Sequence, residues 1–561
     1  MSGLVGVFAV GGSRIPCEPK IAAMAALVAQ DTDVPLSFSD HRLRLEALLN
    51  PTLQESSFRC EDTGCLVWLN GQFHNTPKLV SRLGSDGAKI NNAAELLLQL
   101  YQVKGLLAVP MLRGSFAAVI WDPNEQRLLL FRDPVGLKSL YVHQDGDHLW
   151  FASSERALAQ LEMPSLEPKA FNSLLMSGSL GAGHTLLRKV RCIKPGEIIL
   201  AERGQVRQTC YWQFLQEQSV VARTHQDCAK ALCDSVDRIL AQSGKQTVQI
   251  LDGEGVSSQI LRRLFERRSP YAIQTQTETI VTSRPPSLTE LVRFWGQPFG
   301  DFNAYHWAKT LINKQEGNFL VLPLGEDILF GYHQVFQAQR WQQRQNCDSA
   351  AYDQFASMRS YINQRAVTKT LFADDFIESL ELEGLALEQE IPPEWQTWSG
   401  LEQAQAGLFR WHLQPMLGPL ARIANQHRLT FAMPFLDLDV IDVISELNTE
   451  QHRTGVIGGQ YLAAAFTDLL GPAEHNDSRF NTDFKSLAKG PQQHWASLWP
   501  ECCQVLEAAA LSTLPLKHEL VQRLLQDCRL TNGVIADWQK RALLLAASFT
   551  LWWQMVFASF K

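Results

Sequence analysis

Two patterns of hydrophobic and polar residues divide the chain. Residues 1–210 carry short apolar runs of strand character, separated by turn signals such as Asn70-Gly71. The runs lie at residues 65–69, 115–121, 127–131 and 149–152. Helical periodicity is clear at residues 93–103. This pattern predicts a strand-rich domain with a few helices.

Beyond Tyr211 the pattern changes to long helical stretches interrupted by short apolar strands. Helical periodicity covers residues 224–242 and 400–428, and the strands are expected at residues 247–251 and 319–322. This alternation predicts an α/β core extended by helices. Because 561 residues exceed the size of one hydrophobic core, we expect two domains, residues 1–210 and 211–561, with the boundary set by the change of pattern.

A long apolar segment, ALLLAASFTLWWQMVFASF, occupies residues 542–560. Its length is enough to span a bilayer. Ser548, Thr550, Gln554 and Ser559 interrupt it, and a buried helix that is hydrophobic all round has the same pattern. We therefore interpret it as a buried C-terminal helix, with membrane contact as the alternative.

Composition and charge narrow the class of protein. A net charge of -7 argues against the basic surface that nucleic-acid binding needs. Eleven cysteines lie without metal-ligand spacing, and no signal peptide is recognised. We expect a cytoplasmic protein with free thiols, a small-molecule or peptide substrate, and no nucleic-acid or membrane partner.

Five blocks in the first half occur in a characteristic order. They are MSGLVGVFAV (residues 1–10), LNGQFHN (69–75), LRGSFAAVIWD (112–122), RDPVGLKSLY (132–141) and WFASSE (150–155). In this order they resemble the class II glutamine amidotransferase domains. The resemblance implies an α/β/β/α sandwich of the N-terminal-nucleophile type.

The glutamine site that this resemblance implies is degraded. The family's N-terminal cysteine nucleophile corresponds to Ser2, and the aspartate that holds the substrate's amino group corresponds to Ala93. The arginine motif that clamps the substrate carboxylate is missing between Gln30 and Asp40. Asn70 and Gly71, which form the family's oxyanion hole, are retained. We predict loss of glutaminase activity and a retained structural layer, with an N-terminal serine hydrolase as a minor alternative.

The second half resembles the ATP-pyrophosphatase domain of asparagine synthetases. The resemblance rests on four blocks, DGEGVSS (residues 252–258), QPFGD (297–301), LGEDILFGY (324–332) and MPFLD (433–437). It implies a helix-rich α/β synthetase domain that uses ATP and Mg²⁺. The surviving positions have a structural alternative, in which Phe330 and Phe435 are core residues and Asp437 caps a helix.

Site residues follow from the resemblance. Gly253, Gly255, Ser257 and Ser258 correspond to the loop that cradles pyrophosphate at a helix N-terminus. The candidate metal ligands are Asp327, Asp252 and Glu254. Glu254 replaces a family glycine, Val256 an aspartate, and Ile328 a glutamate. Two carboxylates in an anion cradle repel phosphate unless a metal ion lies between them.

The remaining parts of the synthetase site are less well matched. The family's catalytic lysine corresponds to Asn481, and Lys485, with Lys489 close by, is the candidate substitute. After Pro270 no helix equivalent to the family's adenosine segment is recognised. The sequence therefore leaves the adenine pocket undefined.

Two functions stay open on these residues. One is an ATP-dependent, AMP-forming amide ligase without glutaminase activity, resembling the β-lactam synthetases and lasso-peptide cyclases of natural-product and peptide modification. The other is a catalytically degenerate pseudoenzyme that serves as a structural or partner-binding subunit. Each of these two functions is compatible with a protein partner from the same pathway and with a homodimer.

Overall fold

A computed structural model describes most of the chain. It covers residues 3–13, 15, 18–28, 34–49, 55–84, 90–177, 180, 183–214, 223–244, 246–252, 256–269, 273–277, 287–300, 311, 319–330, 370–380, 395, 398, 400–427, 429–446, 458–470 and 483–557. For some of these, including Asp252, Asp327 and residues 483–494, the description is limited to the backbone.

Contacts divide the chain into two compact units. Unit 1 comprises residues 1–167 and 182–213, with residues 559–561, and unit 2 comprises residues 168–181 and 214–558. The expected boundary at residues 210 and 211 lies next to this division. Residues 168–181 belong with unit 2, because α5 (Pro168–Ser177) packs Phe171 edge-on against Phe372 and Phe549 of that unit.

Unit 1 contains two six-stranded antiparallel sheets. The first has the order β10-β8-β9-β1-β3-β2 and the second β12-β11-β7-β6-β5-β4. The first is built from β1 (Gly3–Ala9), β2 (Val34–Ser39), β3 (Leu43–Leu49), β8 (Tyr141–Asp145), β9 (His148–Ala152) and β10 (Val190–Cys192). The second is built from β4 (Glu55–Arg59), β5 (Leu66–Phe73), β6 (Gly114–Asp122), β7 (Arg127–Arg132), β11 (Glu197–Glu202) and β12 (Gln205–Cys210).

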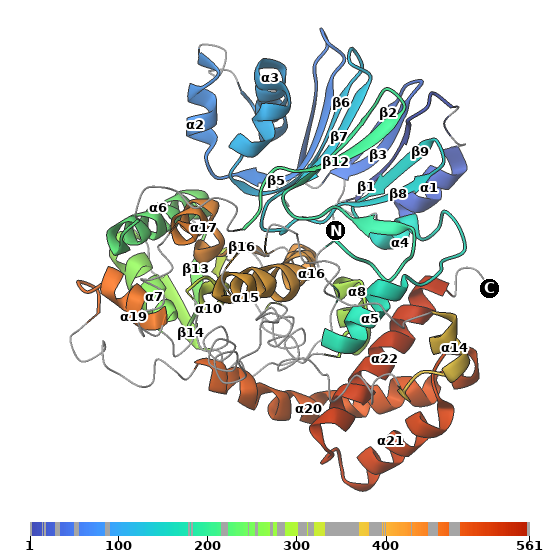
Figure 1. The fold of residues 1–561 in the computed structure, drawn as a ribbon. Coiled ribbons are helices and arrows are strands. Elements are labelled where there is room, and N and C mark those ends of the chain that lie inside the picture. The colour runs from blue at the N-terminus through green and yellow to red at the C-terminus, as the bar shows by residue number, and fades with distance from the viewer. Residues whose placement is uncertain are drawn as a thin grey trace. The chain divides into compact units, whose positions relative to one another are not determined.

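Helices complete the layers of unit 1. They are α1 (Glu18–Ala26), α2 (Thr76–Ser81), α3 (Ala93–Lys104), the 3-10 helix η3 (Gly105–Met111) and α4 (Glu155–Leu158). Figure 1 shows α2 and α3 beside the β5–β6 strands, and α1 and α4 beside β1, β8 and β9. Apolar side chains from both sheets, among them Phe8 and Trp121, fill the layer between them. The expected α/β/β/α sandwich is confirmed.

Unit 2 is organised around a four-stranded parallel sheet of order β14-β13-β15-β16. Its strands are β13 (Val248–Asp252), β14 (Ile273–Thr277), β15 (Phe319–Val321) and β16 (Thr430–Ala432). The expected strands at residues 247–251 and 319–322 are confirmed as β13 and β15. The sequence pattern missed β14 and β16, because five- and three-residue strands carry little periodicity.

Helices surround this sheet and extend beyond it (Figure 1). They are α5, α6 (His225–Ser243), α7 (Val256–Arg268), α8 (Leu288–Trp295), α10 (Glu326–Leu329), α14 (Asp374–Ser379), α15 (Gly400–Leu408), the π-helical turn η6 (Phe409–Leu413), α16 (Gln414–Gln426), η7 (Pro434–Leu436), α17 (Leu438–Ser445), α19 (Gly458–Ala465), α20 (Asp483–Ala508), η9 (Leu511–Thr513), α21 (His518–Leu530) and α22 (Asp537–Phe557). The expected helix-rich α/β domain is confirmed.

The helix expected at residues 400–428 is interrupted by a π-helical turn. In η6 the N–H of Gln414 bonds to the carbonyl of Phe409, five residues earlier. Pro415 has no N–H to offer the carbonyl of Trp411. The proline thus accounts for the wider turn at this point, and α16 then continues to Gln426.

The apolar C-terminal segment forms α22, and most of its side chains are buried. Ser548 is fully buried in this helix and holds a neighbouring chain segment. Its Oγ accepts a bond of 3.1 Å from the N–H of Phe299 and donates one of 2.8 Å to the carbonyl of the same residue. The interpretation as a buried helix is confirmed. No helix among the described residues has the length and apolarity to cross a membrane.

Candidate functional site

The parallel sheet of unit 2 has a point where its strand order reverses. From β13 the chain passes through α7 to β14 on one side, and β15 then lies on the other side of β13. In open α/β sheets, ligands bind outside the carboxyl ends of the strands at such a point. The segment 253–255 and the loop 322–325 begin at these ends of β13 and β15. This edge of the sheet is therefore the candidate site.

One side-chain contact joins the segments that follow the two strands at the candidate site. Ser257, in the first turn of α7, donates a hydrogen bond of 2.9 Å from Oγ to Oε1 of Glu326, at the start of α10. Ser257 is buried, and Glu326 is partly exposed. The helix N-terminus beside them favours negative charge. A carboxylate and a hydroxyl thus lie together where an anion would meet the backbone N–H groups of α7.

Backbone geometry fixes the position of Glu326. Gly325 has a φ of +95°, and a Cβ at that residue would lie 2.4 Å from Cδ2 of Leu436. A glycine is required there for conformation and for space. At the C-terminal end of α10, Gln405 of α15 donates from Nε2 to the carbonyls of Ile328 (3.1 Å) and Leu329 (2.6 Å). These contacts hold α10 at both of its ends.

The structure places the predicted synthetase residues as follows. Ser257 and Ser258 are buried in the first turn of α7. Asp252 ends β13 and Asp327 lies in α10, but their side chains lie outside the described part of the structure. Gly253, Glu254 and Gly255 lie outside it entirely. Lys485 lies in α20, again without a described side chain.

The oxygen donors at the site suit a hard divalent cation. Mg²⁺ takes carboxylate, hydroxyl and water oxygens, and it is bound through one or two carboxylates together with substrate phosphates. The Glu326 carboxylate and the Ser257 hydroxyl are donors of this kind. Among the described side chains, no cluster of three or more His, Cys, Asp or Glu residues forms a metal site. Asp252, Glu254 and Asp327, the ligands predicted from the sequence, have no described side chains and are outside that statement.

The block at residues 433–437 is structural. Phe435 is fully buried and meets the buried Phe330 edge-on, with ring centroids 6.1 Å apart. Asp437 caps α17 by accepting from the N–H of Asp439, and it forms an ion pair with Arg238 of α6 at 2.6 Å. The structural alternative for Phe330, Phe435 and Asp437 is confirmed.

In unit 1, Asn70 and Gly71 lie on β5. Asn70 is buried and lies opposite Glu55 on one side and Ala117 on the other. Gly71 has a φ of +121°, and a Cβ there would lie 1.9 Å from the carbonyl oxygen of Ser115. The close approach of β6 therefore requires glycine at this residue. Retention of Gly71 is explained by the fold whether or not an oxyanion binds.

Ala93 is the first residue of α3, and the side chains of its neighbours form hydrogen bonds at the start of this helix. Asn92 accepts from the N–H of Glu95 at 2.9 Å. The Glu95 carboxylate in turn accepts from the backbone N–H (2.8 Å) and the side-chain amide (3.0 Å) of Asn91. The methyl group of Ala93 offers no charge, and the nearby carboxylate of Glu95 is used by the helix start.

The RDPVGLKSLY block forms a buried turn after β7. Asp133 is fully buried and accepts from the N–H groups of Gly136 (2.6 Å), Leu137 (3.0 Å) and Lys138 (3.1 Å). Arg132 donates to the carbonyls of Gly136 (2.6 Å) and Ile193 (2.8 Å). Burial lowers the pKa of the Lys138 ammonium, and the carboxylates of Glu55 and Asp133 oppose that shift. The block that carries the resemblance is thus largely scaffold.

Ser2 lies outside the described residues. Glu326 and Gln405 were missed as site residues. Glu326 could have been found from its place directly after the glycine of LGEDILFGY. Gln405 has no signal in the sequence, since its role depends on the packing of α15 against α10.

Two family models match the chain. The glutamine amidotransferase domain matches residues 33–212, and asparagine synthase matches residues 314–554.

Curated relatives match over parts of their length. Asparagine synthetase [glutamine-hydrolyzing] 2 of Bacillus subtilis (strain 168) is 25% identical over 271 residues, which is 45% of this chain and 35% of the relative. Asparagine synthetase [glutamine-hydrolyzing] 1 of the same organism is 28% identical, covering 32% and 29%. A probable asparagine synthetase of Dictyostelium discoideum is 36% identical, covering 18% of each. The matches thus span about a third or less of these relatives.

Among solved structures, the glutamine phosphoribosylpyrophosphate amidotransferase of Bacillus subtilis matches with 14% identity and a TM-score of 0.25, over 60% of this chain and 71% of that one. A TM-score this low has no bearing on the fold.

Sheet topology, site and family models together define a class of protein, in which an amidotransferase-type sandwich is followed along the chain by a synthetase-type α/β unit. The chain thus combines a glutamine amidotransferase domain with an asparagine synthase domain, and it is similar to asparagine synthetases over parts of their length.

Proposed function

We propose that this protein is an ATP-dependent amide ligase without glutaminase activity. A carboxylate substrate is activated by ATP as an acyl-adenylate, and an amine that does not come from glutamine captures it. The contact between Ser257 and Glu326, at the strand-order reversal of the parallel sheet, carries the proposal. It supplies oxygen ligands beside a helix N-terminus, which is the environment that a magnesium-bound triphosphate needs.

Loss of the glutaminase function is supported by the start of α3. Ala93 has no carboxylate for the amino group of glutamine, and Oε2 of the nearby Glu95 already accepts from the backbone N–H and the side-chain amide of Asn91. Without a charged residue to hold it, the substrate is not positioned for catalysis. The retained Asn70 and Gly71 carry no charge and do not replace that residue.

The substrates that fit this interpretation are small molecules or peptides that carry a carboxylate and an amine, as in the lasso-peptide cyclases and β-lactam synthetases. A peptide substrate implies a protein partner from the same pathway that makes or delivers it. Lys485 is the proposed cation for the transition state of amide formation, in place of the residue corresponding to Asn481.

The same contact supports a second candidate, a pseudoenzyme that binds a partner. Without a cation, the Glu326 carboxylate repels phosphate from the first turn of α7. A chain that had given up nucleotide binding would tolerate such a carboxylate. The two candidates thus differ in one property, which is Mg²⁺-dependent binding of ATP.

Calorimetric titration with ATP and Mg²⁺ separates them. We expect binding by the wild type, and loss of at least about tenfold in affinity, or 1.4 kcal/mol, in Ser257→Ala and Asp327→Ala. Arg207→Ala, on β12 of unit 1, is the matched control and leaves binding unchanged. Failure of the wild type to bind ATP would favour the pseudoenzyme.

The glutaminase part has its own test. Incubation with glutamine is expected to release no ammonia above the background of a heat-treated sample. Ammonia release by the wild type that disappears in Ser2→Ala would mean that an N-terminal hydroxyl nucleophile works without the charge clamp.

A further inference from the structure

The hairpin between β4 and β5 places two cysteines opposite each other. The register of these strands runs from Glu55 opposite Asn70 to Arg59 opposite Leu66, so the next pair is Cys60 and Cys65. The N–H of Cys60 bonds to the carbonyl of Cys65, and the N–H of Gly64 bonds to the carbonyl of Cys60, each at 2.9 Å. With Gly64 at a φ of +71°, this is a β-bulge that closes the turn.

The two thiols extend from the same face of the hairpin. Cys65 belongs to the apolar cluster between the sheet and α3, and Cys60 packs against that cluster from its edge. Side chains opposite each other on one face have Cβ atoms about 4.5–5.5 Å apart. A disulfide needs a Cβ separation of about 3.5–4.5 Å. A small adjustment at the bulge is therefore enough to join the two sulfur atoms.

The two sulfur atoms differ in exposure. The Thr63 hydroxyl, in the turn between them, accepts a hydrogen bond of 3.4 Å from the backbone N–H of Cys65. Cys60 is partly exposed at the end of the hairpin, and Cys65 is buried. An oxidant in solution can thus reach one sulfur, while the second is positioned behind it.

The protonation of the two thiols is unequal as well. Hydrogen bonds from Thr63 lower the pKa of Cys60. Burial raises the pKa of Cys65, and the carboxylate of Asp122 adds to that shift. A thiolate is the nucleophile in thiol oxidation. Cys60 is therefore the sulfur that reacts first, and Cys65 is the protonated thiol that follows.

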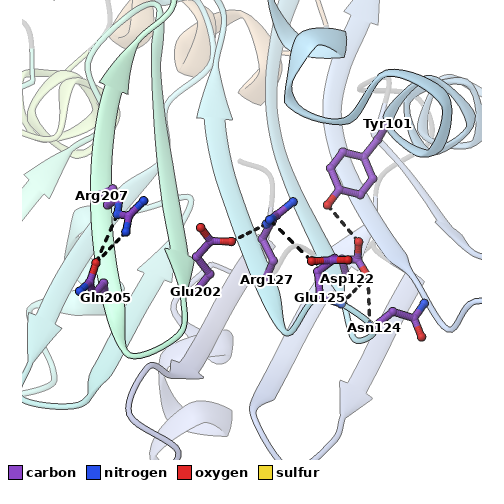
Figure 2. Close-up of polar contacts among 8 residues, drawn as sticks. All are labelled: Tyr101, Asp122, Asn124, Glu125, Arg127, Glu202, Gln205 and Arg207. Atoms are coloured by element: carbon purple, nitrogen blue, oxygen red, sulfur yellow. Dashed lines mark hydrogen bonds and ion pairs between the residues drawn. The ribbon is translucent and has the colours of Figure 1, made fainter.

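Asp122, whose charge acts on Cys65, is held in place by hydrogen bonds to both of its oxygens. Figure 2 shows Tyr101 directed at Asp122, with the hydroxyl donating to Oδ2 at 3.0 Å. The other oxygen, Oδ1, accepts from the N–H groups of Asn124 and Glu125. Asn124 also donates from its side chain to the carbonyl of Thr63 at 3.1 Å, which ties this network to the hairpin.

We propose that Cys60 and Cys65 are a hydroperoxide-reactive dithiol that closes to a reversible intramolecular disulfide. The Cys60 thiolate attacks one oxygen of the peroxide, the O–O bond breaks, and the expelled hydroxide takes up the proton that Cys60 had released and leaves as water, so that Cys60 becomes a sulfenic acid. The Cys65 sulfur then attacks the Cys60 sulfur and forms the S–S bond, while the Cys65 proton joins the sulfenic hydroxyl, which leaves as the second water. Two thiols and one hydrogen peroxide yield one disulfide and two waters, and a dithiol reductant reverses the step.

Peptide mass spectrometry after treatment with about one equivalent of hydrogen peroxide tests this in the full chain. We expect a peptide pair linked through Cys60 and Cys65 that is two hydrogens lighter than the reduced pair. In Cys65→Ser, dimedone traps the sulfenic acid at Cys60. In Cys60→Ser, oxidation at Cys65 falls by at least about tenfold, because the buried thiol is protonated.

Cys210→Ser is the matched control, since Cys210 is exposed on β12, away from the hairpin. This variant is expected to form the linked pair at the wild-type rate. The proposal is overturned if Cys60 and Cys65 are both recovered as free thiols under conditions that oxidise Cys210. It is also overturned if Cys60 links mainly to another cysteine. Far-ultraviolet circular dichroism of each variant shows that it is folded.

Discussion

Ser257 Oγ lies 2.9 Å from Oε1 of Glu326 and donates to it, joining the helix after β13 to the helix after β15. These are the two strands between which the order of the parallel sheet reverses. A serine at a helix N-terminus is an ordinary partner for an anion. Here the anion is supplied by the protein itself, so any phosphate must share this place with a carboxylate.

Gly71 is predicted to be required for folding of unit 1. In Gly71→Ala the new Cβ meets the Ser115 carbonyl oxygen at 1.9 Å and the residue has a φ of +121°. We expect a loss of about 3 kcal/mol or more in the free energy of unfolding, because both strain and a backbone clash arise. Urea unfolding measures this change.

Gly204→Ala is the control for this substitution. Gly204 also has a positive φ, +77°, but nothing lies within 4 Å of the place that a Cβ would take there. Its cost is expected to be about 1 kcal/mol, from conformation alone. Equal costs at the two glycines would mean that β5 and β6 are not as closely apposed as described.

Ser548 is predicted to stabilise unit 2 through both backbone groups of Phe299. Ser548→Ala leaves a buried N–H and a buried carbonyl without their partner. We expect a loss of about 2–4 kcal/mol in the free energy of unfolding. Thr550→Val is the control, since the buried Thr550 hydroxyl bonds within its own helix, to the carbonyl of Ala546. It should cost less than about 1 kcal/mol, and a larger loss there than at Ser548 would refute the assignment.

His143 is predicted to make stability fall with acid. Burial on β8 lowers its pKa, against the opposing charges of Glu162 and Asp145, while Lys189 adds to the lowering. The unfolded chain therefore takes up this proton first, near a pKa of about 6.5. The stabilising contribution is complete above that pH and is lost as the pH falls toward the lower folded pKa.

The check is thermal unfolding between pH 7 and pH 5. His143→Gln is expected to show a smaller fall in melting temperature over this interval than the wild type. His518→Gln, at an exposed residue on α21, should keep the wild-type slope. An unchanged slope in His143→Gln would contradict the prediction.

Sequence patterns predicted the layers well and the contacts poorly. The strands at residues 115–121 and 127–131 and the helix at residues 93–103 carry enough periodicity to be recognised, and they are β6, β7 and α3. Short strands such as β14 and β16 carry too little periodicity to be recognised. The π-helical turn before Pro415 was missed as well, because a proline in a helical pattern indicates an interruption without giving its form.

The candidate site shows the same difference. The motifs place Ser257 and Glu326 each at a helix start after its own strand, 69 residues apart along the chain. That they meet depends on β13 and β15 being neighbours in the sheet, which only the topology determines. Gln405 is further still from any motif, and its amide reaches α10 because α15 packs there.

Under the proposed function, ATP binding at this site requires a cation between Glu326 and phosphate, so the Mg²⁺ dependence of ATP binding is the decisive measurement. Calorimetric titrations with ATP in Mg²⁺ and in EDTA are compared for the wild type and Glu326→Gln. We predict that the wild type binds ATP more tightly with Mg²⁺ than in EDTA, and that the ratio of these two affinities is at least about tenfold smaller in Glu326→Gln, because the neutral amide neither ligates the cation nor repels phosphate. Absence of ATP binding by the wild type with Mg²⁺, or equal binding in EDTA, would contradict a cation-bridged nucleotide site.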